Sequence, residues 1–558
     1  MSCMLRCQRN PPKIVNTILS NRILNWLFAF AVTALFSLNS AAQQRFQRYN
    51  CIVPNEQERA KVPPSPNIAH APHRLSLFNP DLWTHTQDKH SIVVLVEFSD
   101  QAFSMENPRE RYDSIFNRPG YNEGRGVGCV ADYFREQSGG LCDITFDVYG
   151  PVRVSTKAKE AGTYGGSVLR SALQTLVDSL KADNPTMGEG CDWAGNGKAQ
   201  QVVFVYAGYG GNESAAVCKG CVWPNTSTFS NVTLPSGIKA STYTASAELW
   251  SSNRLCGIGT ICHEFSHSLG LPDIYPTSNS AEEYSVVDEW DLMDGGNFTN
   301  NGWCPCNYTA LEKMLLGWQT PVELDSPTTV IDMKAVSEGG ETYLVRNTDS
   351  EFYLLENRQW SGWDLRLPGH GLVISHVDYD VSVWRGNTVN NNPTHHRYEL
   401  VHADNMDYND WDRYISAHPE IYKDGNPYIS GHNNHLCNSP YPFTAEDGTV
   451  NCELTDESVP AATLFYPNDD GLMLMSKPIT DITMTDDGLV SFRFCQLKGD
   501  ANGDGRVDVA DYIAIAHHIL GNTPDNFDPL GADVNGDGLI NVADYIAVVH
   551  LILENTQE

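Results

Sequence analysis

The sequence predicts a multidomain protein in which an α/β domain is followed by a β-sandwich-like domain and by a small all-α domain. Its 558 residues are more than one hydrophobic core usually organises. Buried-strand runs alternate with stretches of helical spacing up to about residue 270, whereas short β-rich runs separated by Gly, Asn, Asp and Pro occupy 325–496. The C-terminal region repeats a 21-residue unit at an offset of 33 residues, with 14 of 21 positions identical.

The N-terminus has the pattern of an export signal. Basic residues precede an uncharged apolar run over 24–38, and the small residues at 40–42 suit cleavage before Gln43. Because a membrane span needs about 20 apolar residues, a signal peptide over 1–42 is favoured over an uncleaved anchor. We therefore expect a secreted, extracellular or cell-surface-associated protein with no stable membrane span after cleavage. The formal net charge of −32 argues against nucleic acid as a partner.

The same patterns predict the segment boundaries. Residues 43–86 are rich in Pro, Asn and His without any period, which is typical of a pro-segment or linker. The α/β domain is assigned to 87–324, the β-rich accessory domain to 325–496 and the C-terminal domain to 497–558. Within the α/β domain, the patterns predict strands over 90–100, 144–154 and 201–210 and helices over 130–138 and 167–183.

The stretch TICHEFSHSLGLPDIY contains the residues of a metal site. His263 and His267 are four residues apart, so a helix places them on one face, one turn apart. Two imidazoles at this spacing form half of a Zn²⁺ site. Glu264 can lie beside the open position of the metal and take a proton from water, as in the HExxH motif of metallopeptidases. A core helix with incidental histidines is the alternative interpretation.

A catalytic zinc needs a third protein ligand, and the residues after the helix can supply it. Gly270 can end the helix in the left-handed conformation, and Pro272 prevents the helix from resuming. The chain therefore turns, and Asp273 can return to the metal as an oxygen ligand. The fourth coordination position is left for water.

The extended pattern HExxHxxGxxD resembles the metzincin metallopeptidases, and EWDLMDGG offers Met293 as their methionine turn. HEFSHSLGLPDIY with WDLMDGG, and LLENRQ with LPGHGLVISHVDYD further on, resemble the M6, or immune inhibitor A-like, family over about 87–495. The resemblance implies a metzincin-like α/β catalytic domain with one zinc bound by His263, His267 and Asp273. It also implies a metalloendopeptidase in which Glu264, as general base and acid, assists attack of zinc-bound water on a peptide bond.

The repeated unit has the spacing of a calcium-binding loop. Oxygen ligands fall at EF-hand positions 1, 3, 5, 9 and 12, with Gly at position 6. They are Asp500, Asn502, Asp504, Asp508 and Asp511 in the first copy and Asp533, Asn535, Asp537, Asn541 and Asp544 in the second. We expect no helix before either loop, and position 12 is Asp rather than Glu. Solvated acidic turns are the alternative.

A loop followed by one helix, in two copies, resembles a type I dockerin. This resemblance implies a small all-α domain, two bound Ca²⁺ ions and a cohesin-type protein partner. Val509 and Ala510, with Val542 and Ala543, lie where dockerins vary for partner choice. Because they are the same in both copies, docking in two alternative orientations is expected to be possible.

The full sequence contains fifteen cysteines, which suits an exported protein because exported proteins can keep disulfides. Cys218 and Cys221 form a CxxC, and no second such pair has zinc-ribbon spacing, so disulfides are favoured over a structural zinc site. Without Cys3 and Cys7, which leave with the signal, thirteen remain, an odd number. Cys51 lies in the predicted pro-segment, where its thiolate could bind the catalytic zinc and keep the enzyme latent. A disulfide at Cys51 or an incidental thiol is favoured over this switch.

Two other functions compete with peptide hydrolysis. A non-catalytic adhesin or scaffold on the same fold would bind protein without needing Glu264. A glycan hydrolase would be expected to show paired catalytic carboxylates, which are not recognisable in this sequence. In the β-rich region, His376, Asp378, His395 and His396 could form a calcium site or a substrate contact. Polar residues at strand ends and in loops are the favoured interpretation, since no metal-ligand spacing recurs there.

Overall fold

We describe the protein from a computed structural model of the whole chain. The structure describes residues 81–85, 88–213, 218–250, 253–278, 285–418, 436–445, 447–495, 497–503, 506–535 and 537–555. The predicted signal peptide, most of the predicted pro-segment with Cys51, and the loop ligand Asp504 lie outside these residues.

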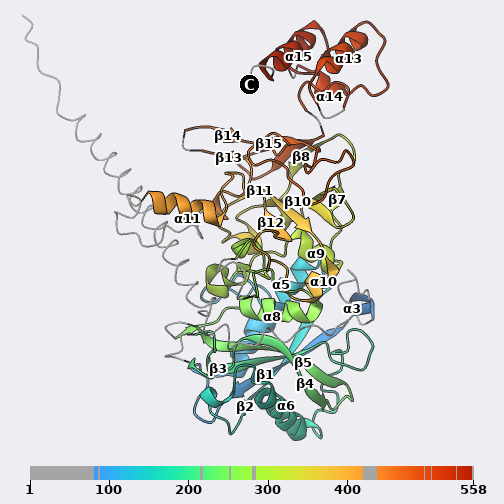
Figure 1. Cartoon of the computed structure of the whole chain (residues 1–558). Helices are drawn as coiled ribbons and strands as arrows, with labels where there is room; N and C mark the ends of the chain where they lie inside the picture. The colour runs from blue at the N-terminus through green and yellow to red at the C-terminus, as the bar shows by residue number, and fades with distance from the viewer. Residues whose placement is uncertain are drawn as a thin grey trace, which may run out of the picture. The chain divides into compact units, whose positions relative to one another are not determined.

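The N-terminal part is built on a six-stranded sheet with the order β2-β1-β3-β5-β4, in which β6 pairs with β5 (Figure 1). Strands β2, β1, β3 and β5 are parallel, whereas β4 and β6 are antiparallel to β5. The strands are β1 (Lys89–Glu97), β2 (Ile144–Arg153), β3 (Val202–Tyr209), β4 (Asn225–Thr233), β5 (Lys239–Trp250) and β6 (Arg254–Leu255). The helices are α3 (Asp81–Thr84), α4 (Pro108–Asn117), α5 (Val130–Gln137), α6 (Gly166–Leu180), α8 (Gly259–Leu269) and α9 (Ala310–Leu316).

Most of the predicted elements of this part are confirmed. The strands predicted over 90–100, 144–154 and 201–210 are β1, β2 and β3, and the two predicted helices are α5 and α6. Strands β4 and β5 were not predicted, because their Ser- and Thr-rich sequences show neither a continuous apolar run nor a clear alternation.

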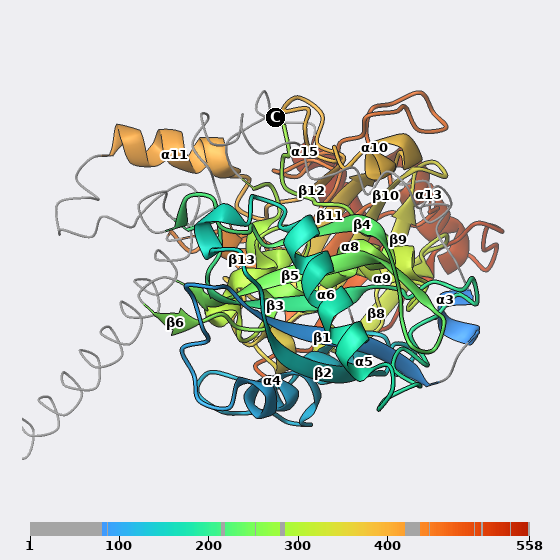
Figure 2. The same ribbon diagram turned by 90° about the horizontal axis from the view of Figure 1, so that it is seen from below.

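The two faces of this sheet pack into separate cores. Val93 and Leu95 of β1 point to the face that contacts α5 and α8, whereas Ile92, Val94 and Val96 point to the face that contacts α6. This division follows from the alternation of side chains along a strand. Figure 1 shows α6 and α8 on opposite sides of the sheet, and Figure 2 shows α6 lying across it from below.

The β-rich part contains a five-stranded sheet with the order β12-β11-β10-β9-β7 and a three-stranded sheet with the order β15-β16-β8. The first sheet comprises β7 (Val322–Glu323), β9 (Tyr343–Arg346), β10 (Glu351–Arg358), β11 (Gly371–Asp378) and β12 (Tyr398–Leu400). The second comprises β8 (Thr328–Met333), β15 (Ile479–Met484) and β16 (Val490–Phe494), and β13 (Phe443–Thr444) pairs with β14 (Val450–Asn451). Helices α10 (Val381–Arg385) and α11 (Tyr408–Ala417) lie in connections.

The five-stranded sheet takes part in two cores. Leu355 and Ile374 share a core with Phe492 of the three-stranded sheet, which is a sandwich-like arrangement. Leu354 and Val373 point from the opposite face of the five-stranded sheet and belong to the core that also contains α8. The hydrophobic core therefore continues across the sequence boundary predicted at 324/325.

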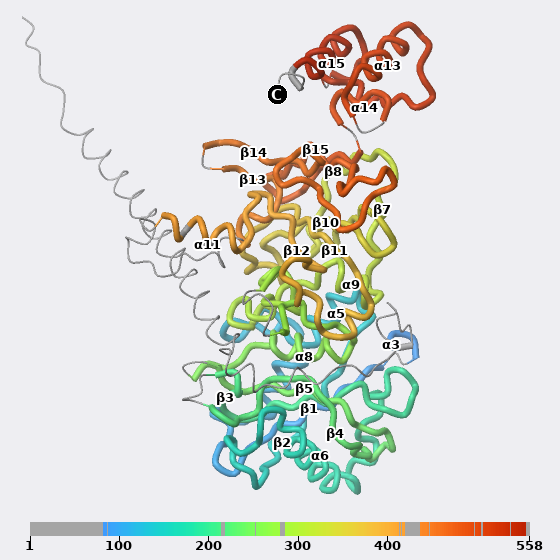
Figure 3. The backbone as a smooth tube through the Cα atoms, in the orientation of Figure 1, coloured from blue at the N-terminus to red at the C-terminus, as the bar shows by residue number. Residues whose placement is uncertain are grey.

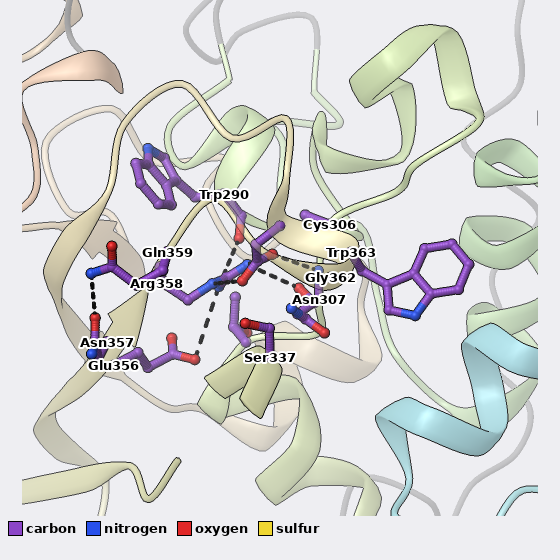
Figure 4. Close-up of polar contacts among 12 residues, drawn as sticks. Trp290, Cys306, Asn307, Ser337, Glu356, Asn357, Arg358, Gln359, Gly362 and Trp363 are labelled. Atoms are coloured by element: carbon purple, nitrogen blue, oxygen red, sulfur yellow. Dashed lines mark hydrogen bonds and ion pairs between the residues drawn. The ribbon is translucent and has the colours of Figure 1, made fainter. Parts of the chain in front are cut away.

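A buried arginine joins β10 to the segment that precedes this boundary (Figure 4). Arg358 is fully buried and makes two hydrogen bonds of 2.8 Å to the carboxylate of Asp364. It also donates to the carbonyl oxygens of Trp290, at 3.3 Å, and Asn307, at 3.2 Å. Because an unpaired buried guanidinium would be costly, these bonds specify how β10 meets the 290–307 segment.

The C-terminal region forms its own small core, which includes Ile515 and Val548 from equivalent positions of the two repeats. Its helices α13 (Val509–Ile519), α14 (Pro529–Ala532) and α15 (Val542–Asn555) follow one another along the red part of the chain in Figure 3. The expectation that no helix precedes either loop was wrong for the second copy. Asp528 caps the one-turn helix α14, with Pro529 at its first position, and α14 ends directly before Asp533.

One disulfide, between Cys218 and Cys221, is present among the described residues. Cys304 and Cys306, which are two residues apart in the sequence, are both buried and do not form a disulfide with each other. None of the described helices has the length and apolar character that crossing a bilayer requires.

Candidate metal centre and catalytic site

Helix α8 places both motif histidines in the interior. Its apolar residues Ile261, Cys262 and Phe265 belong to the core between the sheet and the β-rich part. The helix ends at Gly270, which has φ 114° and whose N–H reaches the carbonyl oxygens of Ser266 and His267. At this φ a side chain would be strained, so glycine allows the sharp turn that brings the chain back.

The turn brings Asp273 to both histidines. Oδ1 of Asp273 lies 3.2 Å from Nε2 of His263 and 3.2 Å from Nε2 of His267. All three residues are buried, and their potential ligand atoms lie within 4.8 Å of one another. Within the residues that the structure describes, this is the one such group of three His, Cys, Asp or Glu side chains.

Hydrogen bonds from the other ring nitrogens fix both imidazoles. Nδ1 of His263 lies 2.9 Å from the carbonyl oxygen of Leu292, and Nδ1 of His267 lies 2.8 Å from that of Leu271. A carbonyl oxygen can only accept, so both Nδ1 atoms carry the hydrogen, and in the neutral rings each Nε2 has a lone pair. These lone pairs face Oδ1 of Asp273, which is buried and lacks a donor of normal geometry. Three electron-pair donors converging on one point fit a bound Zn²⁺.

The electrostatics of the three side chains also favour a positive charge at this point. Burial disfavours a charged ring, but the Asp273 carboxylate raises the pKa of His267 to about 9. Burial would raise the pKa of Asp273, yet His267 and His263 hold it well below its usual range. A proton on an imidazole and a metal ion are thus alternative counter-charges for Asp273.

Glu264 lies next to His263 on the same helix and is also buried. Burial raises the pKa of its carboxyl group, and the two histidines oppose that rise. The backbone carbonyl of Glu264 accepts hydrogen bonds from the hydroxyls of Thr226 on β4 and Thr244 on β5. Two strands that were not predicted therefore fix the position of the predicted base.

Met293 lies in a buried turn that supports the site through its backbone. Its carbonyl oxygen accepts a hydrogen bond of 2.9 Å from the N–H of Ile274, the residue after Asp273. The Met293 N–H is bonded to Oδ1 of Asp291 at 2.7 Å. The carbonyl oxygen of Leu292, in the same turn, is bonded to the His263 ring. The turn therefore supports both the histidine helix and the segment that carries Asp273.

Sequence reasoning missed Asn387, which bonds both to the backbone and to the carboxylate of Asp273. Asn387 stands in an Asn-rich loop, GNTVNNN, 114 residues away in sequence, and no local signal distinguishes it from its neighbours. The singled-out histidines His376 and His395 instead pair with carboxylates of the β-rich part, Glu351 and Asp378.

The two predicted calcium loops have matching hydrogen bonds. The position-12 residues Asp511 and Asp544 are both fully buried and accept from the N–H groups of Asn502 and Asn535, at 3.1 and 3.2 Å. The position-9 residues Asp508 and Asn541 accept from the N–H groups of Ala510 and Ala543 at the starts of α13 and α15. Of the remaining ligands, Asp500 is buried, and Asp533 and Asp537 accept hydrogen bonds within their own loop.

Two imidazoles and a carboxylate that converge beside a buried glutamate are an arrangement typical of metal-dependent hydrolases. Comparisons with known proteins agree and are more specific. Residues 215–317, which contain all the proposed zinc-site residues, match the model of the immune inhibitor A peptidase M6 catalytic domain. Residues 498–553 match the dockerin type I domain. The resemblances to the M6 peptidase family and to a type I dockerin are thus confirmed.

Individual relatives point the same way. The chain is 24% identical over 287 residues to immune inhibitor A of Bacillus thuringiensis subsp. alesti, covering 42% of this chain and 41% of that protein. It is 21% identical over 306 residues to the pre-pro-metalloprotease PrtV of Vibrio cholerae serotype O1, covering 47% of this chain and 33% of that protein. The chain thus matches less than half the length of each relative.

Proposed function

We propose that this protein is a secreted zinc metalloendopeptidase that attaches to a cohesin-type partner through its C-terminal dockerin. The convergence of two Nε2 atoms on the buried Oδ1 of Asp273 is the observation that carries the peptidase assignment. The matches to the M6 catalytic domain and to two metalloprotease relatives support it. The catalytic domain is proposed to have the metzincin-like α/β fold, with Met293 as its methionine turn.

The proposed ligands of the single catalytic zinc are Nε2 of His263, Nε2 of His267 and Oδ1 of Asp273. Bound there, zinc would supply Lewis acidity to a substrate carbonyl group and to a water molecule. Glu264 is proposed to accept a proton from the attacking water and to deliver it to the leaving amine. Its raised pKa favours this exchange, because a more basic carboxylate takes a proton more readily near neutral pH.

The predicted dockerin ligands are proposed to bind one Ca²⁺ per loop. Exposed apolar residues at equivalent positions of the repeats support a partner surface. Val509 and Val542 are 51% and 58% exposed, Ile513 and Ile546 are 44% and 51%, and Leu520 and Leu553 are 75% and 55%. Such exposure of paired apolar side chains is typical of a protein interface. Because each copy presents the same set, either is proposed to dock.

The remaining sequence predictions are kept as part of this proposal. They are the signal peptide over 1–42, a pro-segment or linker over 43–86, and the segment boundaries near 324 and 496. Latency through Cys51 remains the disfavoured alternative to a disulfide or an incidental thiol there.

Trp83 constrains any processing site, because it is buried against the core and its indole N–H donates to the carbonyl of Leu316 at 2.9 Å. Cleavage is therefore proposed to fall before α3, inside the predicted 43–86 segment rather than at its end.

Casein cleavage with and without a chelator tests the peptidase assignment, and Glu264→Gln tests its mechanism. The amide has nearly the shape of the carboxylate but cannot act as a base, so the variant should keep about one zinc per chain. Its kcat should fall by about 10²- to 10⁴-fold. Full activity in the variant would refute the role of Glu264, and a parent protein that binds zinc without cleaving casein would favour the scaffold function.

A further inference from the structure

The loop after α10 runs beside the segment that carries Asp273. Asn391 Oδ1 accepts hydrogen bonds from the N–H groups of Thr277, at 2.6 Å, and Ser278, at 3.1 Å. The Thr277 hydroxyl donates to the carbonyl oxygen of Asn387 at 2.6 Å. Segment 387–391 of the β-rich part is thereby joined to segment 273–278 of the catalytic part by backbone and side-chain hydrogen bonds. We call the contact between these two segments the seam.

At one end of this seam, Asn387 makes two hydrogen bonds to a single residue. Its Oδ1 accepts from the backbone N–H of Asp273 at 2.6 Å, and its Nδ2 donates to Oδ2 of Asp273 at 2.7 Å. Asn387 is 8% exposed, so water competes little for these bonds. Both functions of the amide are used on the proposed third ligand.

The surroundings of Asn387 keep it in this position. The buried side chains of Trp384 and Val389, on either side of it, belong to the core that contains α8. Its backbone has φ 54°, a left-handed conformation that asparagine tolerates better than most residues. This less favourable backbone conformation thus occurs at the residue whose side chain contacts Asp273.

We propose that Asn387 is a positioning residue for the metal site, an inference that rests on the proposed zinc-binding function. Its amide holds Oδ2 of Asp273, which leaves Oδ1 as the oxygen that faces both imidazoles. A carboxylate without this contact could rotate about its terminal torsion and present either oxygen, or both, to the metal. Partners of this kind commonly contribute about 10- to 100-fold to metal affinity. The β-rich part thus completes the zinc site.

A pair of variants separates this role from general support of the seam. Asn387→Gly removes the amide without strain at positive φ, whereas the control Asn391→Ala breaks the neighbouring bonds to Thr277 and Ser278 but leaves Asp273 untouched. Zinc affinity is measured by competition with a chromophoric chelator, and ligand geometry by the visible spectrum of the cobalt-substituted full chain. Thermal unfolding of the metal-free proteins reports the purely structural effect of each change.

Asn387→Gly should weaken zinc binding by about 10- to 100-fold and alter the cobalt spectrum. Asn391→Ala should lower the unfolding temperature with little change in either metal readout. Asn387→Asp serves where the glycine variant does not fold, because it keeps the acceptor for the Asp273 N–H and changes only the contact with Oδ2. An altered cobalt spectrum in that variant supports the role.

Parent-like affinity and an unchanged cobalt spectrum in the Asn387 variants would overturn the inference while leaving the zinc site intact. Equal losses in the Asn387 and Asn391 variants would show that the seam acts only as a structural support. A parent chain that takes up no stoichiometric zinc would instead refute the proposed function, and this inference with it.

Discussion

The protonation state of His267 in the metal-free protein offers a sharp test of the site geometry. Its Nε2 faces Oδ1 of Asp273 at 3.2 Å inside the protein, and this carboxylate raises the pKa of the ring from 6.5 to about 9. At pH 8 the protonated fraction of a group with that pKa is about 0.9, whereas the protonated fraction of an ordinary histidine is about 0.03. The two cases differ by a factor of about 30.

The direction of the pH effect follows from the raised pKa. The protonated ring stabilises the metal-free fold fully below the ordinary pKa of 6.5, and that contribution is lost as the pH rises through about 9. Zinc requires the neutral ring, so binding must displace this proton. Below pH 9 the apparent zinc affinity should therefore fall about tenfold per pH unit as the His267 ring takes up its proton.

Nitrogen-15 NMR of histidine-labelled, metal-free protein measures the titration directly, with His267→Gln to assign the signal. Asp273→Asn is the matched variant, because it removes the charge that raises the pKa and keeps the size of the side chain. In it the His267 titration should move toward or below 6.5. A parent titration near 6.5, with zinc affinity constant between pH 7 and 8.5, would refute the convergence of His267 and Asp273 described here.

Three further outcomes are expected. Gly270→Ala places a side chain at φ 114°, which should lower the free energy of unfolding by about 1–2 kcal/mol. The unfolding temperature and the zinc affinity should both fall, and an unfolding temperature and affinity equal to those of the parent would show that the turn is not restrictive. A fragment spanning 497–558 should gain helix on adding calcium, since its clustered carboxylates repel one another without the ion, and circular dichroism unchanged by calcium would contradict the calcium loops. Val509→Asp or Val542→Asp alone should leave cohesin binding nearly intact while the double variant loses it, and loss in either single variant would exclude two-fold docking.

The parts of the site that could be predicted from sequence are those encoded by short intervals. The spacing of His263 and His267, the break at Gly270 and Pro272 and the return of Asp273 all lie within eleven residues, where helix geometry relates sequence to space. The calcium loops are likewise local, and their repetition distinguishes them from chance acidic turns. The alternating strands and helices of the first sheet carry an equally local signal.

The residues that hold the ligands in place could not be predicted in this way. Thr226 and Thr244 act on Glu264 through its backbone, and Leu292 acts on His263 through its own carbonyl, an atom that every residue possesses. Asn387 reaches Asp273 from 114 residues away. Such contacts are created by tertiary packing, and a single sequence contains no periodicity or spacing that reports them.

The continuity of the core across 324/325 leads to a last prediction, that residues 81–324 alone do not form a stable peptidase, although they include α3 with Trp83. Phe352, Leu354, Val373 and Val377 are buried in the core that contains α8. Burial of each such side chain contributes about 1.5–3 kcal/mol, so losing these four contacts forfeits about 6–12 kcal/mol, comparable to the whole stability of a typical domain. Truncation also removes Arg358, and with it the hydrogen bonds to the carbonyls of Trp290 and Asn307.

A fragment spanning 81–496 is the matched control, because it differs from the 81–324 fragment only in keeping the β-rich part. It should unfold cooperatively and cleave small peptides like the parent, whereas the 81–324 fragment should lack a cooperative thermal transition and bind zinc weakly. Cooperative unfolding of that fragment with parent-like zinc affinity would show that the β-rich part is dispensable for the site. The opposite result would mean that the peptidase unit extends well beyond the 215–317 segment matched by its family model, because the β-rich part, which supplies Asn387 from a loop and Arg358 from β10, is needed to hold the ligands in place.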